Sequence, residues 1–340
     1  MNSTVELLQL LGSPFASPTV RTFTKMELIR LYQLSEKNRM LFYYLDRLQT
    51  MNPRNRVSTF SSIHESENIK RLRIDNSISR VSRILSETHI EHAVFKTIRP
   101  YRSTTVDIDV IVFAGYAKAV ETMQEAGYSL VVQGPMSTTI WDRDNGIGID
   151  LYDQIAVSSI TYIDKRKLID SIIEKKLTNN RPVKTLKPEA DLICIIAHSI
   201  VKEQMYTLAE YYTFIYYLKQ IDVENFVRTA EKCNIKHATK THAAITAFLH
   251  CTAHATVPDT LKKILDTIGE EDFEAARLQR EEFETPHKYH PITIGKSLIE
   301  MMKQNETRRS LAKQLSNMFD AKFANDFFRK LVDHAFRETY

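Results

Sequence analysis

The chain has 340 residues, more than the usual length of a single hydrophobic core, so we expect two domains or one domain with a large helical extension. Its 43% hydrophobic and 26% charged residues are ordinary for a soluble protein, and a net charge of +4 does not by itself indicate a nucleic-acid partner. The longest apolar run, residues 190–200, is too short to span a membrane, and neither a basic leader nor paired cysteines are evident, so we expect a cytoplasmic protein.

The N-terminal part of the sequence is expected to be helical. A helix is predicted over Lys25–Thr50, followed by a polar linker over residues 52–66. Between residues 68 and 88, apolar residues recur at helical spacing with arginines among them, which predicts a basic amphipathic helix. We therefore assign residues 1–66 to an N-terminal helical extension and begin the next domain at residue 67.

The central segment combines strand patterns with most of the glycines. We expect strands over 91–96 and 106–113, a helix over 115–126, and strands over 128–133, 137–141 and 147–152, with a hairpin turn at Asn145-Gly146. This order predicts an α+β fold with a small mixed sheet and flanking helices. Residues 67–187 would form this core.

Beyond Asp164 the pattern becomes almost entirely helical. A helix is expected over 165–176, a long helical run over 188–219, and shorter amphipathic helices to the end of the chain. Residues 188–340 are therefore assigned to a mainly helical C-terminal domain.

Two aspartates, Asp107 and Asp109, lie two positions apart within the apolar run of the second strand. Alternate side chains of a strand share a face, so both carboxylates should point the same way. Such a pair is unfavourable unless a cation or proton compensates it, which favours metal ligands. If the strand of Asp150 lies beside them, three carboxylates converge and suit two Mg²⁺ ions roughly 4 Å apart. Asp153 would replace Asp150 if the strand register shifted by one residue.

These residues resemble a known family. Phe-Lys-Thr at 95–97, then Asp-Ile-Asp-Val at 107–110 and a later strand aspartate at 150, are similar to the nucleotidyltransferase fold of DNA polymerase β, CCA-adding enzymes and many small prokaryotic transferases. The resemblance is closest to uncharacterised prokaryotic and archaeal nucleotidyltransferase-like proteins, and covers roughly residues 68–220. It implies that Asp107, Asp109 and Asp150 bind Mg²⁺ and are catalytic, with Asp150 also helping to deprotonate the acceptor.

The turn after the first strand departs from the family pattern. The family places Gly-Ser or Gly-Gly there, whereas this chain has Lys96-Thr97. The resemblance implies that the lysine meets the phosphates as a point charge and that the threonine replaces the serine hydroxyl. Further candidates for nucleotide phosphates are two arginines of the following loop and two residues one helical turn apart later in the chain: Arg99, Arg102, His198 and Lys202. A lone histidine in an apolar helix is more often a core residue bonded to a neighbour.

The expected function is that of a Mg²⁺-dependent enzyme that moves a nucleoside monophosphate from ATP or another NTP to a hydroxyl, releasing pyrophosphate. The acceptor could be an RNA end, a protein side chain or a small molecule. Four arginines of the helix over 68–88 permit an RNA acceptor, although a solvated helix face explains them as well: Arg71, Arg73, Arg80 and Arg83. Two alternatives are a non-catalytic nucleotide- or RNA-binding protein, favoured by the missing glycine, and a toxin–antitoxin component.

Overall fold

The computed structural model describes residues 2–19, 21–50, 58–157, 159–269, 272–280 and 283–317. Its centre is a seven-stranded mixed sheet with strand order β3-β4-β5-β2-β1-β9-β8. The β2–β5 and β1–β9 pairs are parallel, and the other neighbouring strands run antiparallel. The strands are β1 (His92–Val94), β2 (Asp107–Val112), β3 (Ser129–Gln133), β4 (Ser137–Asp142), β5 (Ile147–Tyr152), β8 (Ile172–Lys176) and β9 (Pro182–Leu186).

The first part of the sheet follows the predicted order of elements. Helix α4 (Ser58–Glu87) precedes β1 and β2, helix α5 (Tyr116–Glu125) follows them, and β3, β4 and β5 come next. The β4–β5 hairpin turns at the predicted Asn-Gly pair, where Gly146 has a φ of 65° that suits glycine. The α+β fold class is confirmed.

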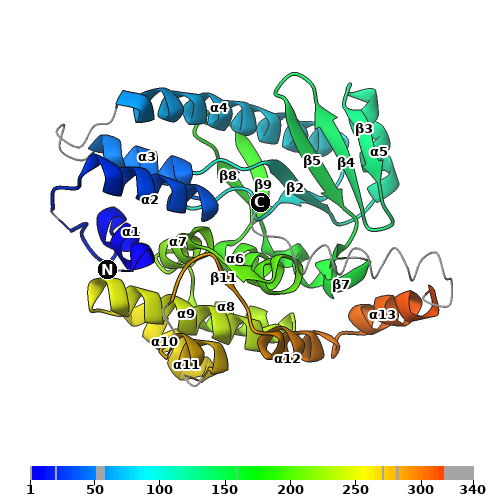
Figure 1. Ribbon diagram of the computed structural model, residues 1–340. Coiled ribbons are helices and arrows are strands. Elements are labelled where there is room, and N and C mark those ends of the chain that lie inside the picture. The colour runs from blue at the N-terminus through cyan, green and yellow to red at the C-terminus, as the bar shows by residue number, and fades with distance from the viewer. Residues whose placement is uncertain are drawn as a thin grey trace.

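Different helices cover the two faces of the sheet (Figure 1). On one face, α4 and α5 pack against alternate residues of the strands, including Ile108, Val110 and Ile149. On the opposite face, Phe95 and Ile111 join a second hydrophobic cluster with helix α6 (Pro188–His198). Because side chains alternate along a strand, the residues of β2 between the α4-facing positions point toward the α6 side. Asp107 and Asp109 occupy those positions.

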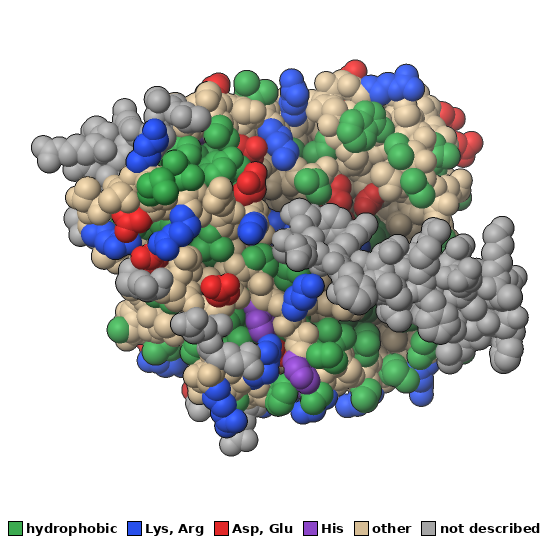
Figure 2. Space-filling view, viewed as in Figure 1, with side chains coloured by type: hydrophobic (Ala, Val, Ile, Leu, Met, Phe, Trp, Pro, Cys, Tyr) green, Lys and Arg blue, Asp and Glu red, His purple; other side chains and the backbone are tan. Residues whose placement is uncertain are grey.

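No helix in the described ranges combines the length and the apolar character that crossing a bilayer requires. On the face drawn in Figure 2, Lys and Arg side chains are interspersed with Asp and Glu, in keeping with the small net charge of +4.

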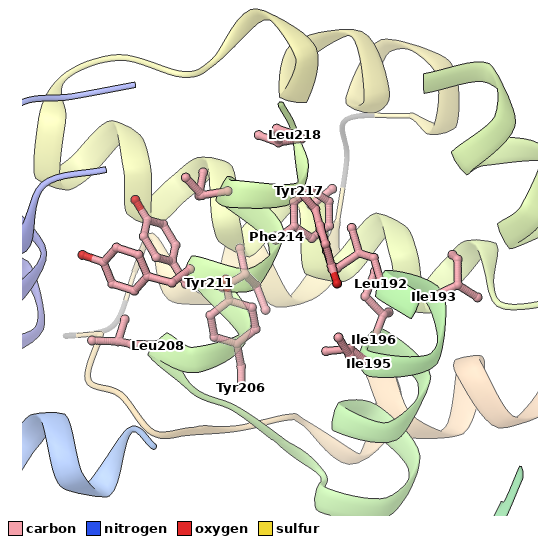
Figure 3. Packing of buried hydrophobic residues seen from close by; sticks show 14 of the residues in the cluster. Leu192, Ile193, Ile195, Ile196, Tyr206, Leu208, Tyr211, Phe214, Tyr217 and Leu218 are labelled. Carbon is pink, nitrogen blue, oxygen red and sulfur yellow. The ribbon is translucent and has the colours of Figure 1, made fainter. Parts of the chain in front are cut away.

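Helices from both ends of the chain share the larger hydrophobic cluster. Figure 3 shows Leu192 and Ile196 of α6 beside Phe214 and Tyr217 of α7 (Leu208–Tyr217). Four leucines of α1 (Ser3–Leu11) belong to the same cluster and are fully buried. The remaining helices are α2 (Lys25–Lys37), α3 (Leu41–Thr50), α8 (Val223–Lys232), α9 (Lys236–His254), α10 (Asp259–Ile268), α11 (Phe273–Leu278), α12 (Pro291–Met301) and α13 (Asn305–Asn317). Two short strand pairs are β6 (Ile155–Val157) with β7 (Ile160–Ile163), and β10 (Met205–Tyr206) with β11 (His287–Lys288).

Two N-terminal predictions were wrong in detail. The predicted linker over 52–66 is helical from residue 58 onward, because α4 begins there, and residues 51–57 lie outside the described ranges. The helix expected over 25–50 is two helices, since Arg39 takes a φ of 57° between α2 and α3 and an L-residue with that φ cannot continue a right-handed helix.

Two predictions beyond residue 164 were also wrong. The helix expected over 165–176 is instead a pair of 3₁₀ turns, over 165–167 and 169–171, followed by strand β8, because pairing with β9 outweighs the helix propensity of its Lys and Glu residues. The helix expected over 188–219 breaks after α6 into the π-helical turn η4 (Ser199–Glu203). Gln204 then ends the turn at a φ of 54°, and a capping box of Thr207 and Glu210 starts α7.

Candidate active site

The structure brings Asp107, Asp109 and Asp150 together on one face of the sheet. Across the parallel β2–β5 pair, Asp109 is directly opposite Asp150, and Asp107 is opposite Gly148, two residues earlier on β5. All three carboxylates are partly buried and point to the α6 side of the sheet. Asp153, the alternative third acid, lies past the end of β5, where its Oδ1 is 2.8 Å from Nζ of Lys165.

The three carboxylates influence one another strongly. Burial and the neighbouring charges of Asp109 and Asp150 raise the pKa of Asp107 to about 6. Burial also raises the pKa of Asp150, although the Thr139 hydroxyl donates to its Oδ1 at 2.6 Å and opposes the rise. Burial acts to raise the pKa of Asp109 too, but the adjacent Lys96 ammonium outweighs it and brings that pKa below its ordinary value. The pKa is therefore lowered for one carboxylate of the cluster, Asp109, and raised for the other two, because nearby cations only partly offset their burial.

Lys96 provides this compensation from the β1–β2 loop. Its backbone φ is 59°, the conformation that glycine adopts most readily, and its N–H donates to Oδ1 of Asp191 at 2.6 Å. Its Nζ lies 3.2 Å from Oδ1 of Asp109 and 3.2 Å from Nδ1 of His198. Only 5% of the side chain is exposed. The turn thus keeps a glycine-like backbone while its side chain enters the carboxylate cluster.

Thr97 fixes the backbone next to the cluster. Its buried Oγ1 accepts the N–H of Asp109 at 2.9 Å and donates to the carbonyl of Phe95 at 3.2 Å. These bonds tie the end of β1 to β2 at the aspartate pair. The predicted role of this hydroxyl as a phosphate ligand stays a prediction.

His198 links Lys96 to the π-helical turn. Burial, reinforced by the Lys96 ammonium, lowers the pKa of His198 to about 3, so the imidazole is neutral at neutral pH. Since Nδ1 accepts from Lys96, the proton is on Nε2, which donates to Oε1 of Glu203 at 3.1 Å. Arg39 donates to the other oxygen of Glu203 at 2.7 Å. Lys202, on the same turn, acts electrostatically on all three aspartates.

The two loop arginines contact helices. Arg99 donates to Oγ1 of Thr213 at 2.9 Å and lies 3.7 Å from Glu210 on α7. Arg102 lies 2.6 Å from Oδ1 of both Asp46 and Asn68, and its guanidinium covers the ring of Phe42. These contacts attach the β1–β2 loop to helices α3, α4 and α7, and phosphate binding by either arginine stays a prediction.

Sequence reasoning missed several residues around the cluster. Asp191 accepts hydrogen bonds from the Lys96 backbone and from the Tyr217 hydroxyl, the latter at 2.7 Å. Asp191 could have been recognised in the sequence as a charged residue near the start of a strongly apolar helix. The pairing of Arg39 with Glu203 carries no such signal, because the two residues are 164 positions apart.

The donor set fits a hard divalent cation. In the part of the chain that the structure describes, no group of three His, Cys, Asp or Glu side chains is close enough to hold a metal ion as it stands. The oxygens nonetheless suit Mg²⁺, because burial and the neighbouring carboxylates disfavour the ionised form of Asp107 when no cation is near, and Asp150 is bonded by a neutral hydroxyl. A cation between them would offset the burial and the mutual repulsion that raise both pKa values.

Comparison with known protein families identifies the family of the chain. A family model described as "Uncharacterised nucleotidyltransferase" matches residues 24–249, more than half of the chain and a range that includes all the predicted site residues. The crystal structure of an antigenic nucleotidyltransferase-like protein from Paracoccidioides brasiliensis is similar over 47% of this chain and 74% of that chain, at 13% sequence identity and a TM-score of 0.26. No curated protein matches the chain significantly.

Proposed function

This chain belongs to the uncharacterised nucleotidyltransferase family, and we propose that it transfers a nucleoside monophosphate from an NTP to a hydroxyl acceptor, with Mg²⁺, releasing pyrophosphate. The observation that carries the proposal is the convergence of Asp107, Asp109 and Asp150 on two neighbouring parallel strands. Positively charged side chains on the β1–β2 loop and on η4 surround them. This combination of oxygen ligands and cations suits a metal-bound triphosphate.

The residues would divide the work as follows. Asp107 and Asp150, with Asp109, would hold Mg²⁺, which when bound supplies positive charge to the triphosphate and acidifies the attacking hydroxyl. Lys202 would contact the triphosphate as a further point charge. Asp150 would also help to deprotonate the acceptor hydroxyl, as the resemblance to the family implies. Free thiols at all three cysteines suit a reaction in the cytoplasm.

One observation favours a second candidate, a non-catalytic nucleotide-binding protein of the same fold. The Lys96 ammonium bonds Asp109 and places positive charge where a fully active cluster would hold metal. Under this alternative the site would bind an NTP without turning it over.

A labelling experiment separates the two candidates. The protein is incubated with each α-labelled NTP and Mg²⁺, in the presence of cellular RNA and proteins. Label transferred to a macromolecule or small molecule by the wild type, lost in Asp107→Asn and retained in Asp153→Asn, supports the enzyme. Asp153 is the matched control because it lies just past β5 and pairs with Lys165 outside the cluster. Mg²⁺-dependent NTP binding without transfer by the wild type supports the non-catalytic protein.

A further inference from the structure

Lys96 has an unusual backbone for a lysine. Its φ of 59° lies in the left-handed region, which L-residues other than Asn and Asp seldom adopt. The conformation is held from behind by the buried carboxylate of Asp191, which accepts the Lys96 N–H at 2.6 Å. Backbone strain of this kind persists only where the surrounding residues enforce it, and it is common at functional sites. The strained backbone therefore suggests a functional role for the Lys96 side chain.

The Lys96 side chain is fixed in place. Its ammonium group donates to Asp109 and His198, and it lies 4.7 Å and 5.1 Å from the ring centroids of Phe95 and Tyr152. His198 is itself held by Glu203. With 5% of the side chain exposed and several protein partners, Lys96 is not free to move toward a nucleotide phosphate. These contacts hold its amino group within the cluster.

Charge balance then limits the number of metal ions. Three ionised aspartates carry three negative charges, and the Lys96 ammonium cancels one of them at Asp109. The two remaining carboxylates, Asp107 and Asp150, lie on adjacent strands and supply at most the negative charge that balances one divalent ion. Lys202 adds further positive charge at the same place, which weakens the attraction for a second ion.

We infer that Lys96 takes the place of one metal ion, so that the carboxylate cluster binds a single divalent cation between Asp107 and Asp150. This deepens the proposed function, on which it rests only in taking these aspartates as metal ligands. A two-ion site built from the same three aspartates would need the position that the lysine occupies.

The test counts Mn²⁺ ions bound to the full chain by electron paramagnetic resonance, without nucleotide. We expect one Mn²⁺ per chain for the wild type and none for Asp107→Asn. Lys96→Met, which keeps an unbranched side chain one atom shorter and removes its charge, should bind two ions or bind the first at least tenfold more tightly. Lys96→Arg should bind one. Lys165→Met is the matched control, because it removes another buried lysine paired with an aspartate and should leave the count at one.

Three outcomes would overturn the inference. The wild type could bind two Mn²⁺ ions, neither the wild type nor any variant could bind an ion, or Lys96→Met could bind one Mn²⁺ with an affinity equal to or weaker than that of the wild type. If Lys96→Met does not fold, the wild-type count of one or two decides. The readout is independent of catalysis. A chain that binds one Mn²⁺ and transfers no nucleotide keeps the inference and contradicts the proposed function, whereas transfer by a two-ion wild type does the reverse.

Discussion

At the scale of single residues, Asp107 makes metal binding dependent on pH. Its pKa is raised to about 6 by burial and by the other two carboxylates, so it holds a proton at pH 5 and is ionised at pH 7. A metal ion competes with that proton, because only the carboxylate is a ligand. We expect Mn²⁺ affinity to fall roughly tenfold per pH unit below about 6 and to level off above it. Titrations between pH 5 and 8 measure this.

Without metal, the stability of the fold should depend on pH in the opposite direction from the metal affinity. The folded state raises the pKa of Asp107, so the folded chain binds the extra proton more tightly than the unfolded chain, and stability decreases as pH rises from about 4 to about 6. Bound Mn²⁺ should remove this loss. In Asp107→Asn the decrease in stability should shrink to the part contributed by Asp150, whose pKa is also raised, and an unchanged pH dependence would assign it to another group.

At the scale of elements, α4 separates its basic residues into two groups. Three arginines form ion pairs within the chain: Arg71 with Asp75, Arg80 with Asp144, and Arg83 with Glu87. Lys70 and Arg73 instead line a cavity of about 470 Å³, together with the loop before β2 and the β4–β5 turn. The loop residues of that cavity, Thr105 and Val106, immediately precede Asp107. Arg71, Arg80 and Arg83 are therefore held in ion pairs, whereas Lys70 and Arg73 are exposed cations near the start of β2.

If the acceptor is an RNA end, these two cations should contribute to its binding. We expect Lys70→Ala/Arg73→Ala to weaken the binding of a single-stranded RNA about tenfold or more. The slope of log affinity against log salt should decrease by about 1.4, at roughly 0.7 per phosphate contact. Fluorescence anisotropy at several salt concentrations measures both quantities. Arg83→Ala, on the same helix, should change neither quantity. An equal loss of RNA affinity in both variants would mean that the effect comes from net charge and not from contacts of Lys70 and Arg73.

The elements also show how far the sequence could be interpreted. The run around Asp107 and Asp109 is rich in β-branched residues, and Asn145-Gly146 marks a hairpin, so β2, β4 and β5 were predictable from local pattern. Strand β8 was missed because Lys and Glu are helix formers, and only pairing with β9 makes this segment a strand. The parallel β2–β5 register, which places Asp109 opposite Asp150, depends on contacts distant in sequence. The direction of the Lys96 side chain depends on Asp191 in the same way.

At the scale of the whole molecule, the N-terminal helices belong to the packing around the site. Asn38, between α2 and α3, accepts the N–H of Leu208 at 2.9 Å and donates to the carbonyl of Thr285. The Tyr212 hydroxyl donates to the carbonyl of Gly12 at 2.9 Å. Through Arg39, the same segment reaches Glu203 and so the hydrogen-bonded chain to Lys96. The boundary predicted at residue 66 stays a prediction, and these contacts cross it.

Removal of residues 1–57 should therefore unfold the remainder. The four buried leucines of α1 each contribute roughly 1.5–3 kcal/mol, or about 6–12 kcal/mol in total, which is comparable with the whole stability of about 5–15 kcal/mol of an ordinary protein. Circular dichroism of the truncated chain should show loss of cooperative melting. The matched control is the full chain with a protease site within residues 51–57: after cleavage, the two pieces should co-elute from a sizing column and melt together. Separate elution, with a folded larger piece, would mean that the N-terminal helices are an independent extension and that Arg39 is dispensable to the site.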